Sequence, residues 1–391
     1  MLFDPRAHEP VLEAPWDEGA IEDAIRAIAC EADGALRGRD WWAIHPLDAE
    51  SGDPEVFHGI YMGAAGVVWA LDRLARAGLH EPGHDYARLA SDVLESYPLR
   101  PEFGEQPSLW MGFGGIALVA WLLAPSAELA DRLEALVTAE VQPDTLELLW
   151  GSPGLLFIAD ALIERTGEPR WTVAWRALAE RLLASQGEHG FWTQDLYGKV
   201  EEILGAGHGT AGVVAGLARR PELLSPERFA ATVTRAFAAT AIREGAHANW
   251  PPALHEGLVH RTGTIRLQWC HGAPGIVTSL ATLPREPELD ELLLAGGELT
   301  WAAGPLRKGA GLCHGTAGNG FALLKLFTRT GDERWLERAR AFATHAAAQV
   351  QASRREHGHG RHTLWTGDLG AALYLEACLI GESALPGLEA W

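Results

Sequence analysis

The chain has 391 residues, of which 47% are hydrophobic, so it is long and apolar enough to bury a large core. Thirty-two Lys and Arg residues against 52 Asp and Glu residues give a formal net charge of −20, which excludes the basic surface that nucleic-acid binding requires. Four scattered cysteines are too few for a secreted disulfide framework and indicate a reducing compartment, so we expect a cytoplasmic location.

Along the chain, no segment has the properties of a targeting signal or a membrane span. The start, MLFDPRAHEP, lacks the basic head and apolar stretch of a signal peptide. The longest apolar run, residues 115–124, is too short to cross a bilayer. We therefore expect no transmembrane segment.

Seven apolar segments, each opened by a Gly-x-x-Gly sequence, recur at intervals of 39 to 63 residues. They begin at Gly63, Gly112, Gly151, Gly209, Gly272, Gly315 and Gly367. One such glycine pair is a weak signal, but seven in series predict a repeat architecture. A second glycine, Gly167 or Gly331, follows the first glycine of two pairs by sixteen residues and supports the repeat.

Charged segments with a period of 3.6 residues alternate with the apolar ones. They cover residues 21–32, 84–96, 127–140, 171–185, 226–244, 288–303 and 334–350. Alanine, leucine, arginine and glutamate dominate these segments, and convincing strand patterns are few. The pattern predicts an all-α protein.

The alternation of the two kinds of helix predicts how they pack. A helix that is apolar all round must be buried, whereas an amphipathic helix covers it, so we expect seven inner and seven outer helices in an α/α toroid. Glycines at the entrance to each inner helix let the incoming loop approach closely. The alternative, an open α-solenoid, needs different terminal repeats, and none is obvious here. We expect one closed domain over residues 1–391.

The repeat phase brings potential metal ligands together. Cys270 and Cys313 each lie two residues before a glycine pair, in WCHGAPG and LCHGTAG, and His314 lies one residue before its pair. Equivalent positions share one end of the ring, so two thiols and an imidazole converge there, a ligand set suited to Zn²⁺. Three protein ligands leave one position open, as in catalytic zinc sites. By spacing alone His271 is as eligible as His314.

The motifs LQWCHGAPG, GLCHGTAGN, GAGHGTAG and LELLWGSPG resemble those of the lanthionine synthetase C family, which comprises the lantibiotic cyclases and their glutathione-binding LanC-like relatives. The resemblance extends over nearly the whole chain and implies an α/α toroid with one zinc ion held by Cys270, Cys313 and His314. It implies that His208 is the catalytic histidine. Glu147 stands where the cyclases carry a catalytic aspartate, as in the LanC-like branch.

The resemblance also implies roles for two positively charged residues. Arg266, four residues before Cys270, matches an arginine of the cyclases. Lys308, five residues before Cys313, is similar to a LanC-like lysine that contacts glutathione. A cation on a loop is more often only solvated, but both flank the expected metal.

The family resemblance implies addition of a thiol, from a peptide cysteine or from glutathione, to dehydroalanine or dehydrobutyrine, which gives a thioether. The metal would deprotonate the thiol, Arg266 would hold the enolate charge, and His208 with Glu147 would supply the proton. The partners would be a dehydrated peptide or protein, glutathione, or both, and a separate dehydratase.

Two other functions compete with this interpretation. A non-catalytic scaffold would hold glutathione or a peptide at the zinc. An α/α-barrel glycosidase would need a second carboxylate facing Glu147, and none lies in phase with it. The presence of both His208 and Arg266 favours the enzyme over the scaffold.

The remaining polar residues receive ordinary roles. The HGHGRH run at 357–362 fits a solvated loop, although Arg361 could contact an anionic substrate. Asp368 is expected to cap the helix that follows it, and Trp150 and Trp269 could wall the cavity. Ordinary polar or small apolar roles are expected for His45, His58, His255, Cys30 and Cys378.

Overall fold

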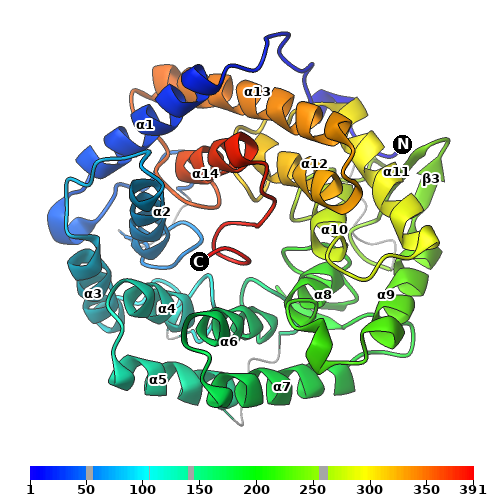
Figure 1. The fold of residues 1–391 in the computed structure, drawn as a ribbon, viewed down its shortest axis with the longest axis horizontal. Coiled ribbons are helices and arrows are strands. Elements are labelled where there is room, and N and C mark those ends of the chain that lie inside the picture. The colour runs from blue at the N-terminus through cyan, green and yellow to red at the C-terminus, as the bar shows by residue number, and fades with distance from the viewer. Residues whose placement is uncertain (50–55, 105, 140–144, 255–262) are drawn as a thin grey trace.

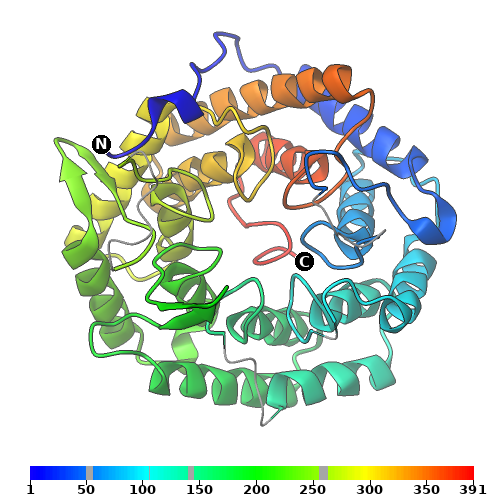
Figure 2. The ribbon, with the colours of Figure 1, turned by 180° about the vertical axis from the view of Figure 1, so that it is seen from behind.

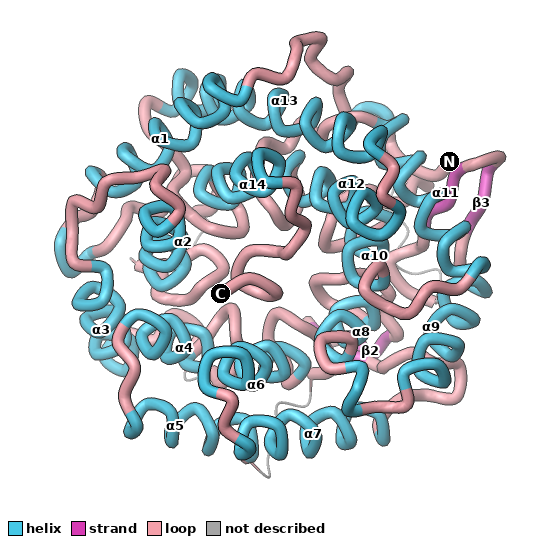
Figure 3. Tube along the Cα trace, in the orientation of Figure 1, coloured by secondary structure: helices cyan, strands magenta, loops and turns pink. Residues whose placement is uncertain are grey.

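The computed structural model describes residues 1–49, 56–104, 106–139, 145–254 and 263–391, and helices make up most of them (Figures 1 and 3). Fourteen α-helices lie in these residues and alternate between an inner and an outer ring. The inner helices are α2 (Ala64–Arg76), α4 (Phe113–Leu123), α6 (Pro153–Thr166), α8 (Thr210–Leu217), α10 (Ala273–Leu280), α12 (Thr316–Thr330) and α14 (Asp368–Ile380). The outer helices are α1 (Glu18–Gly34), α3 (Tyr86–Ser96), α5 (Ala127–Thr138), α7 (Pro169–Ala184), α9 (Pro226–Thr240), α11 (Pro287–Ala303) and α13 (Glu333–His357).

The inner ring is closed. Each inner helix contacts the next, and the last, α14, contacts the first, α2. The first outer helix, α1, packs against α14, so the two ends of the sequence meet in both rings (Figures 1 and 2). The prediction of an α/α toroid with seven inner and seven outer helices is confirmed, and the open solenoid is excluded.

The two rings differ in composition as their burial requires. Residues 114–121 of α4 are all buried, which suits a helix surrounded by others. On α13 the buried residues Trp335, Leu336, Ala339 and Phe342 form one stripe, and charged residues fill the other face. Outer helices α1, α3, α5 and α13 begin with a side-chain cap from Asp or Ser, whereas inner helices other than α6 have glycine at that position.

The glycine pairs allow the loop before each inner helix to fold back onto the start of that helix. At Gly318 an added Cβ would overlap the backbone carbonyl of Leu312, and at Gly315 it would overlap the backbone of Gly311. Gly331, the second-phase glycine, adopts a left-handed conformation with φ of 70° and ends α12. The repeated glycines are therefore required by close backbone contacts at one end of every inner helix.

Two short antiparallel hairpins interrupt the helices, formed by β1 (Gln194–Leu196) with β2 (Lys199–Glu201) and by β3 (Ile242–Glu244) with β4 (His247–Asn249). The helix expected over 226–244 ends at Thr240, so its last residues form a strand and that part of the prediction was wrong. A two-residue turn there, with Gly245 at φ of 61°, allows the two strands to pair instead of extending the helix. Within the described ranges, four 3₁₀ helices cover Pro5–Ala7, Gly38–Asp40, Tyr97–Leu99 and Pro221–Leu223.

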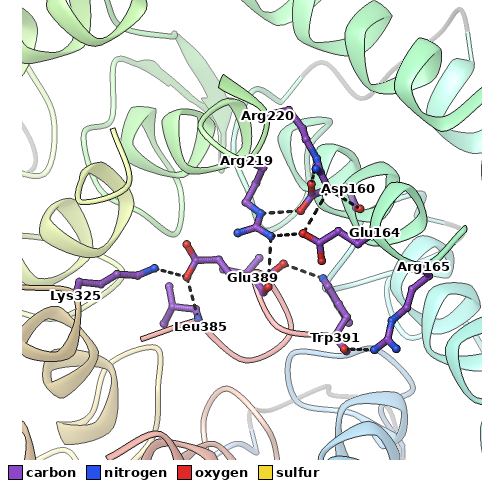
Figure 4. A network of polar contacts seen from close by, with 10 residues as sticks. Asp160, Glu164, Arg165, Arg219, Arg220, Lys325, Leu385, Glu389 and Trp391 are labelled. Atoms are coloured by element: carbon purple, nitrogen blue, oxygen red, sulfur yellow. Dashed lines mark hydrogen bonds and ion pairs between the residues drawn. The ribbon is translucent and has the colours of Figure 1, made fainter. Parts of the chain in front are cut away.

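The segment after α14 turns into the centre of the ring (Figure 1). There Lys325 of α12 and Glu389 form a buried ion pair with an N–O distance of 2.6 Å, and Arg219, which follows α8, donates to the Glu389 carbonyl (Figure 4). Trp110 Nε1, from the loop that enters α4, donates to the Gly387 carbonyl at 3.4 Å. The segment thus fills the centre of the ring and contacts both the C-terminal ends of inner helices and an entry loop.

No described helix is both long enough and apolar enough to cross a bilayer, as expected from the sequence.

Candidate metal centre

The site is built on the loops that enter the inner helices, at the residue two positions before each glycine pair. A chain of backbone hydrogen bonds joins six of these seven equivalent positions, because each N–H donates to the carbonyl of an equivalent residue in a neighbouring repeat at 2.9–3.3 Å. In order of donation the residues are Gly207, Cys270, Cys313, Trp365, Tyr61 and Trp110. Positions equivalent in sequence are thus adjacent around the axis of the ring.

Cys270, Cys313 and His314 are brought together at this level. One ligand atom from each lies within 4.8 Å of the others, and this is the one group of three or more such donors found in the described part of the chain that could hold a metal ion. Burial lowers the pKa of His314 to about 4, so its imidazole is neutral and has a lone pair for a metal. Two soft sulfurs and one imidazole suit zinc.

His271 does not belong to this group, so the geometry favours His314 over His271, the choice that spacing alone left open. Its ring faces the same cavity, and its centroid lies 6.1 Å from that of His208. Burial lowers the pKa of His271 to about 3, and its buried Nδ1 has no hydrogen-bond partner within the described residues. His271 therefore lines the cavity as a neutral side chain.

Each sulfur receives a hydrogen bond from a residue that the sequence analysis missed. Gln268 Nε2 donates to Cys270 Sγ at 2.9 Å, and the Tyr61 hydroxyl is hydrogen-bonded to Cys313. A hydrogen bond with Cys313, assisted by Gln268, lowers the pKa of Cys270 to about 7, while the same bond and burial raise the pKa of Cys313. Tyr61 lies two residues before its glycine pair, like the two cysteines, so the repeat spacing could have identified it. No repeat position or motif in the sequence points to Gln268.

His208 and Glu147 form a second functional group. Their Nδ1 and Oε2 atoms are 2.8 Å apart, and Glu147 is fully buried. The carboxylate also accepts the backbone N–H groups of Leu149 at 3.0 Å and Trp150 at 2.5 Å, which fix its orientation. Burial lowers the pKa of His208, but the hydrogen bond and charge of Glu147 outweigh it, so the pKa is raised overall.

The β1–β2 hairpin covers this histidine. Tyr197 at its turn has a φ of 53° and holds its ring 5.9 Å from that of His208, edge to face. Trp150 Nε1 donates to the Tyr197 hydroxyl at 3.1 Å, but Trp150 is not among the residues that line the cavity at the metal centre, contrary to expectation. Trp269 does not line the cavity: it is buried against Trp110 and Trp365, with ring centroids 5.8 and 4.7 Å away.

The sulfurs and imidazoles face a cavity of about 220 Å³. His208, Arg266 and Lys308 also line it, whereas Glu147 lies behind His208. Arg266 and Lys308 are exposed, and within the described residues no carboxylate pairs with either cation. The structure thus assembles all seven residues singled out from the sequence, six at the cavity and one behind it.

Other expectations were partly wrong. Arg361 is paired with Asp48, with Nε 2.8 Å from the carboxylate, so its charge is already neutralised within the protein. Asp368 accepts the Arg361 backbone N–H at 2.9 Å, and Gly367 occupies the cap position.

The expectations for the histidines and the two remaining cysteines had mixed outcomes. His45 and His362 are buried, so the run at 357–362 is solvated only at its start, and His58 is fully buried against Glu102. Cys30 is exposed, whereas Cys378 is buried as expected. His255 lies outside the described residues.

The family model described as lanthionine synthetase C-like protein matches residues 56–389. LanC-like protein GCL1 of Arabidopsis thaliana is 35% identical over 132 residues, and Glutathione S-transferase LANCL1 of Danio rerio is 32% identical over 149 residues. These alignments cover 32% and 37% of this chain, and the chain spans 30% and 35% of the length of those relatives. Nisin cyclase is similar in fold, with a TM-score of 0.63 at 16% identity over 93% of this chain and 95% of that chain.

Proposed function

The chain belongs to the lanthionine synthetase C-like family, and from this premise we propose that it is a zinc-dependent enzyme that adds a thiol to dehydroalanine or dehydrobutyrine and forms a thioether. The observation that carries the proposal is the convergence of Cys270, Cys313 and His314 on the cavity that His208 also lines. The donor set fits zinc, because two sulfurs and one neutral imidazole lie within 4.8 Å of one another with hydrogen-bond donors on both sulfurs.

A Zn²⁺ ion held by these three residues would supply an open coordination position that lowers the pKa of an incoming thiol and makes it nucleophilic at neutral pH. The sulfur then forms a bond to the β-carbon of the dehydroamino acid. The π-electron pair of the double bond moves into an enolate. Its negative charge is stabilised by the guanidinium of Arg266, which lines the cavity and has no competing carboxylate there.

His208 supplies the proton that completes the addition at the α-carbon. Glu147 binds Nδ1, which leaves Nε2 as the ring atom that can face the substrate. The raised pKa keeps more of the imidazole protonated near neutral pH, as a general acid requires. The thiol proton goes to solvent and His208 recovers one from solvent, so the addition balances without an oxidant.

The source of the thiol is a peptide cysteine or glutathione, and the charges at the cavity support glutathione. Lys308 and Arg266 offer two cations to the carboxylates of a small anionic thiol. The name of the Danio rerio relative refers to glutathione transfer, whereas the name of the structural relative refers to ring closure within a peptide. The dehydrated residue would come from a separate dehydratase. We also propose a cytoplasmic location, because metal-binding thiols must stay reduced, and all four cysteines are free.

Mass spectrometry of a dehydroalanine peptide incubated with zinc-loaded protein tests the proposal. A glutathione adduct identifies the intermolecular reaction. Ring closure changes no mass, so it is detected as loss of an alkylatable thiol in a peptide that also carries cysteine. The Cys313→Ala and His208→Asn variants should form neither product, while Cys30→Ala, an exposed cysteine away from the cluster, should retain activity. Binding of peptide and glutathione without either product would favour the scaffold and refute the enzyme.

A further inference from the structure

We propose that a second cavity beside the metal centre binds the peptide segment that carries the dehydroamino acid, and that it selects acidic segments. The chemical identity of this occupant rests on the proposed function, whereas the cavity rests on the geometry alone. Nothing in the family match assigns it, because part of its wall lies at residues 4–8, before the matched residues.

The two cavities adjoin at three residues. Arg266, Gln268 and Lys308 line both the cavity of about 220 Å³ at the metal centre and a larger one of about 490 Å³. Addition of a free thiol to a peptide brings two molecules together, and the rate gain depends on holding both at once in reacting geometry. The smaller cavity suits the thiol, and the larger one falls in the size range of sites that enclose molecules as large as a short peptide segment.

The charge of the larger cavity indicates an anionic occupant. Three cations, Arg266, Arg307 and Lys308, line it against one carboxylate, Asp4, which is already bonded to Arg6 at 2.8 Å. Arg307 is partly engaged, since its Nε donates to the His8 carbonyl at 2.8 Å and its Nη1 lies 3.6 Å from Glu9. The cavity thus has a local excess of positive charge in a chain of net charge −20, and a concave wall focuses its field.

The part of the cavity wall that residues 4–8 form is fixed in place. The segment at 4–8 pairs with the loop that carries Lys308: the Arg307 N–H donates to the Ala7 carbonyl at 3.0 Å. The His8 ring bonds the Gly304 carbonyl at 2.8 Å, and the Glu9 N–H donates to the Pro305 carbonyl at 3.0 Å. The cavity is therefore preformed, and a peptide that enters it pays little to order the protein.

Binding can be measured without turnover if the thiol is left out. Fluorescence anisotropy of zinc-loaded protein would use two labelled dehydroalanine peptides that differ only in flanking residues, Glu in one and Lys in the other. Because exposed ion pairs each contribute little, two or three of them predict that the Glu peptide binds only about tenfold more tightly at low ionic strength, and the difference should shrink as salt is added.

A variant isolates the cavity from the metal centre. Ala7 is exposed and lines the larger cavity but not the cavity at the metal centre. The Ala7→Trp substitution should therefore fill the larger cavity and weaken binding of the Glu peptide by about tenfold. Zinc content and glutathione affinity, measured by metal analysis and calorimetry, should not change. Ala127→Trp, at an exposed alanine that begins α5 on the opposite part of the ring, is the matched control.

Two results would overturn the proposal: equal binding of the Glu and Lys peptides, or an Ala7→Trp variant that loses glutathione affinity while peptide affinity is unchanged. The second result would assign the larger cavity to the thiol instead. Failure of the proposed function has a different signature, because the wild-type protein would then bind the Glu peptide in this cavity and form no thioether when glutathione is added.

Discussion

Replacing Glu147 by Gln tests the proton donor directly. The Glu147→Gln substitution would keep the shape of the side chain but remove the charge that raises the pKa of His208 above its usual value of 6.5. Burial, which opposes that rise, would then dominate, so the pKa of His208 should fall below 6.5. A hydrogen bond to a charged group contributes about 1.5–3 kcal/mol, and the variant loses this stabilisation of the protonated imidazole.

The sign for activity follows from the role of His208 as an acid. Only the protonated imidazole can donate, so the rate should fall as the pH rises through the pKa of His208, and in Glu147→Gln this fall should occur at lower pH. At neutral pH the variant should lose about 10- to 100-fold in kcat, within the range that general acids contribute. For stability, the raised pKa of His208 favours the folded state below the unfolded value of 6.5, and this contribution disappears as the pH rises through the folded value.

The assay combines a pH–rate profile with an NMR titration of the His208 ring, which reports the pKa even in an inactive variant. Glu147→Asp is the matched control, because it keeps the charge and should hold the pKa of His208 above 6.5. An unchanged or higher pKa in Glu147→Gln would refute the reasoning, whatever the rate.

Three further changes should have measurable effects. Gln268→Leu removes the hydrogen bond to Cys270, so zinc affinity should fall by about 10- to 100-fold, and the sulfur-to-metal charge-transfer band of the cobalt-substituted protein should shift. A band at the same wavelength in the variant would show that this hydrogen bond is absent when metal is bound. Lys325→Met leaves Glu389 buried without its cation and should reduce the free energy of unfolding, measured in denaturant titrations, by about 3–5 kcal/mol. The double variant Lys325→Met/Glu389→Leu should lose less, and an equal loss in both variants would contradict this account. Gly318→Ala places a Cβ against a backbone carbonyl that cannot retreat, so it should unfold at lower temperature, whereas Gly34→Ala, with open space around it, should not.

The sequence predicts the rings and the metal ligands for one physical reason. Repeats that pack alike place equivalent residues at equivalent heights, so the shared phase of Cys270 and Cys313 becomes contact across a backbone hydrogen bond of 3.1 Å. That a single domain covers residues 1–391 stays a prediction.

The contacts that could not be predicted from the sequence join residues with no fixed spacing along the chain. The ion pair that occupies Arg361 comes from Asp48, more than three hundred positions away, and the donor to Cys270 is a neighbour outside the repeat phase. The strand at Ile242–Glu244 likewise depends on a turn that outcompetes a locally plausible helix.

The contact of α1 with α14 sets an order of events during protein synthesis. Residues 18–34 are synthesised long before residues 368–380, the inner helix against which they mainly pack, so this contact forms only after the later segment has emerged. Until then the flanks of α2 and α12 that α14 covers remain open to solvent. A nascent chain of this protein therefore carries exposed apolar surface until residues 368–380 have been synthesised, and it is prone to aggregation during that interval.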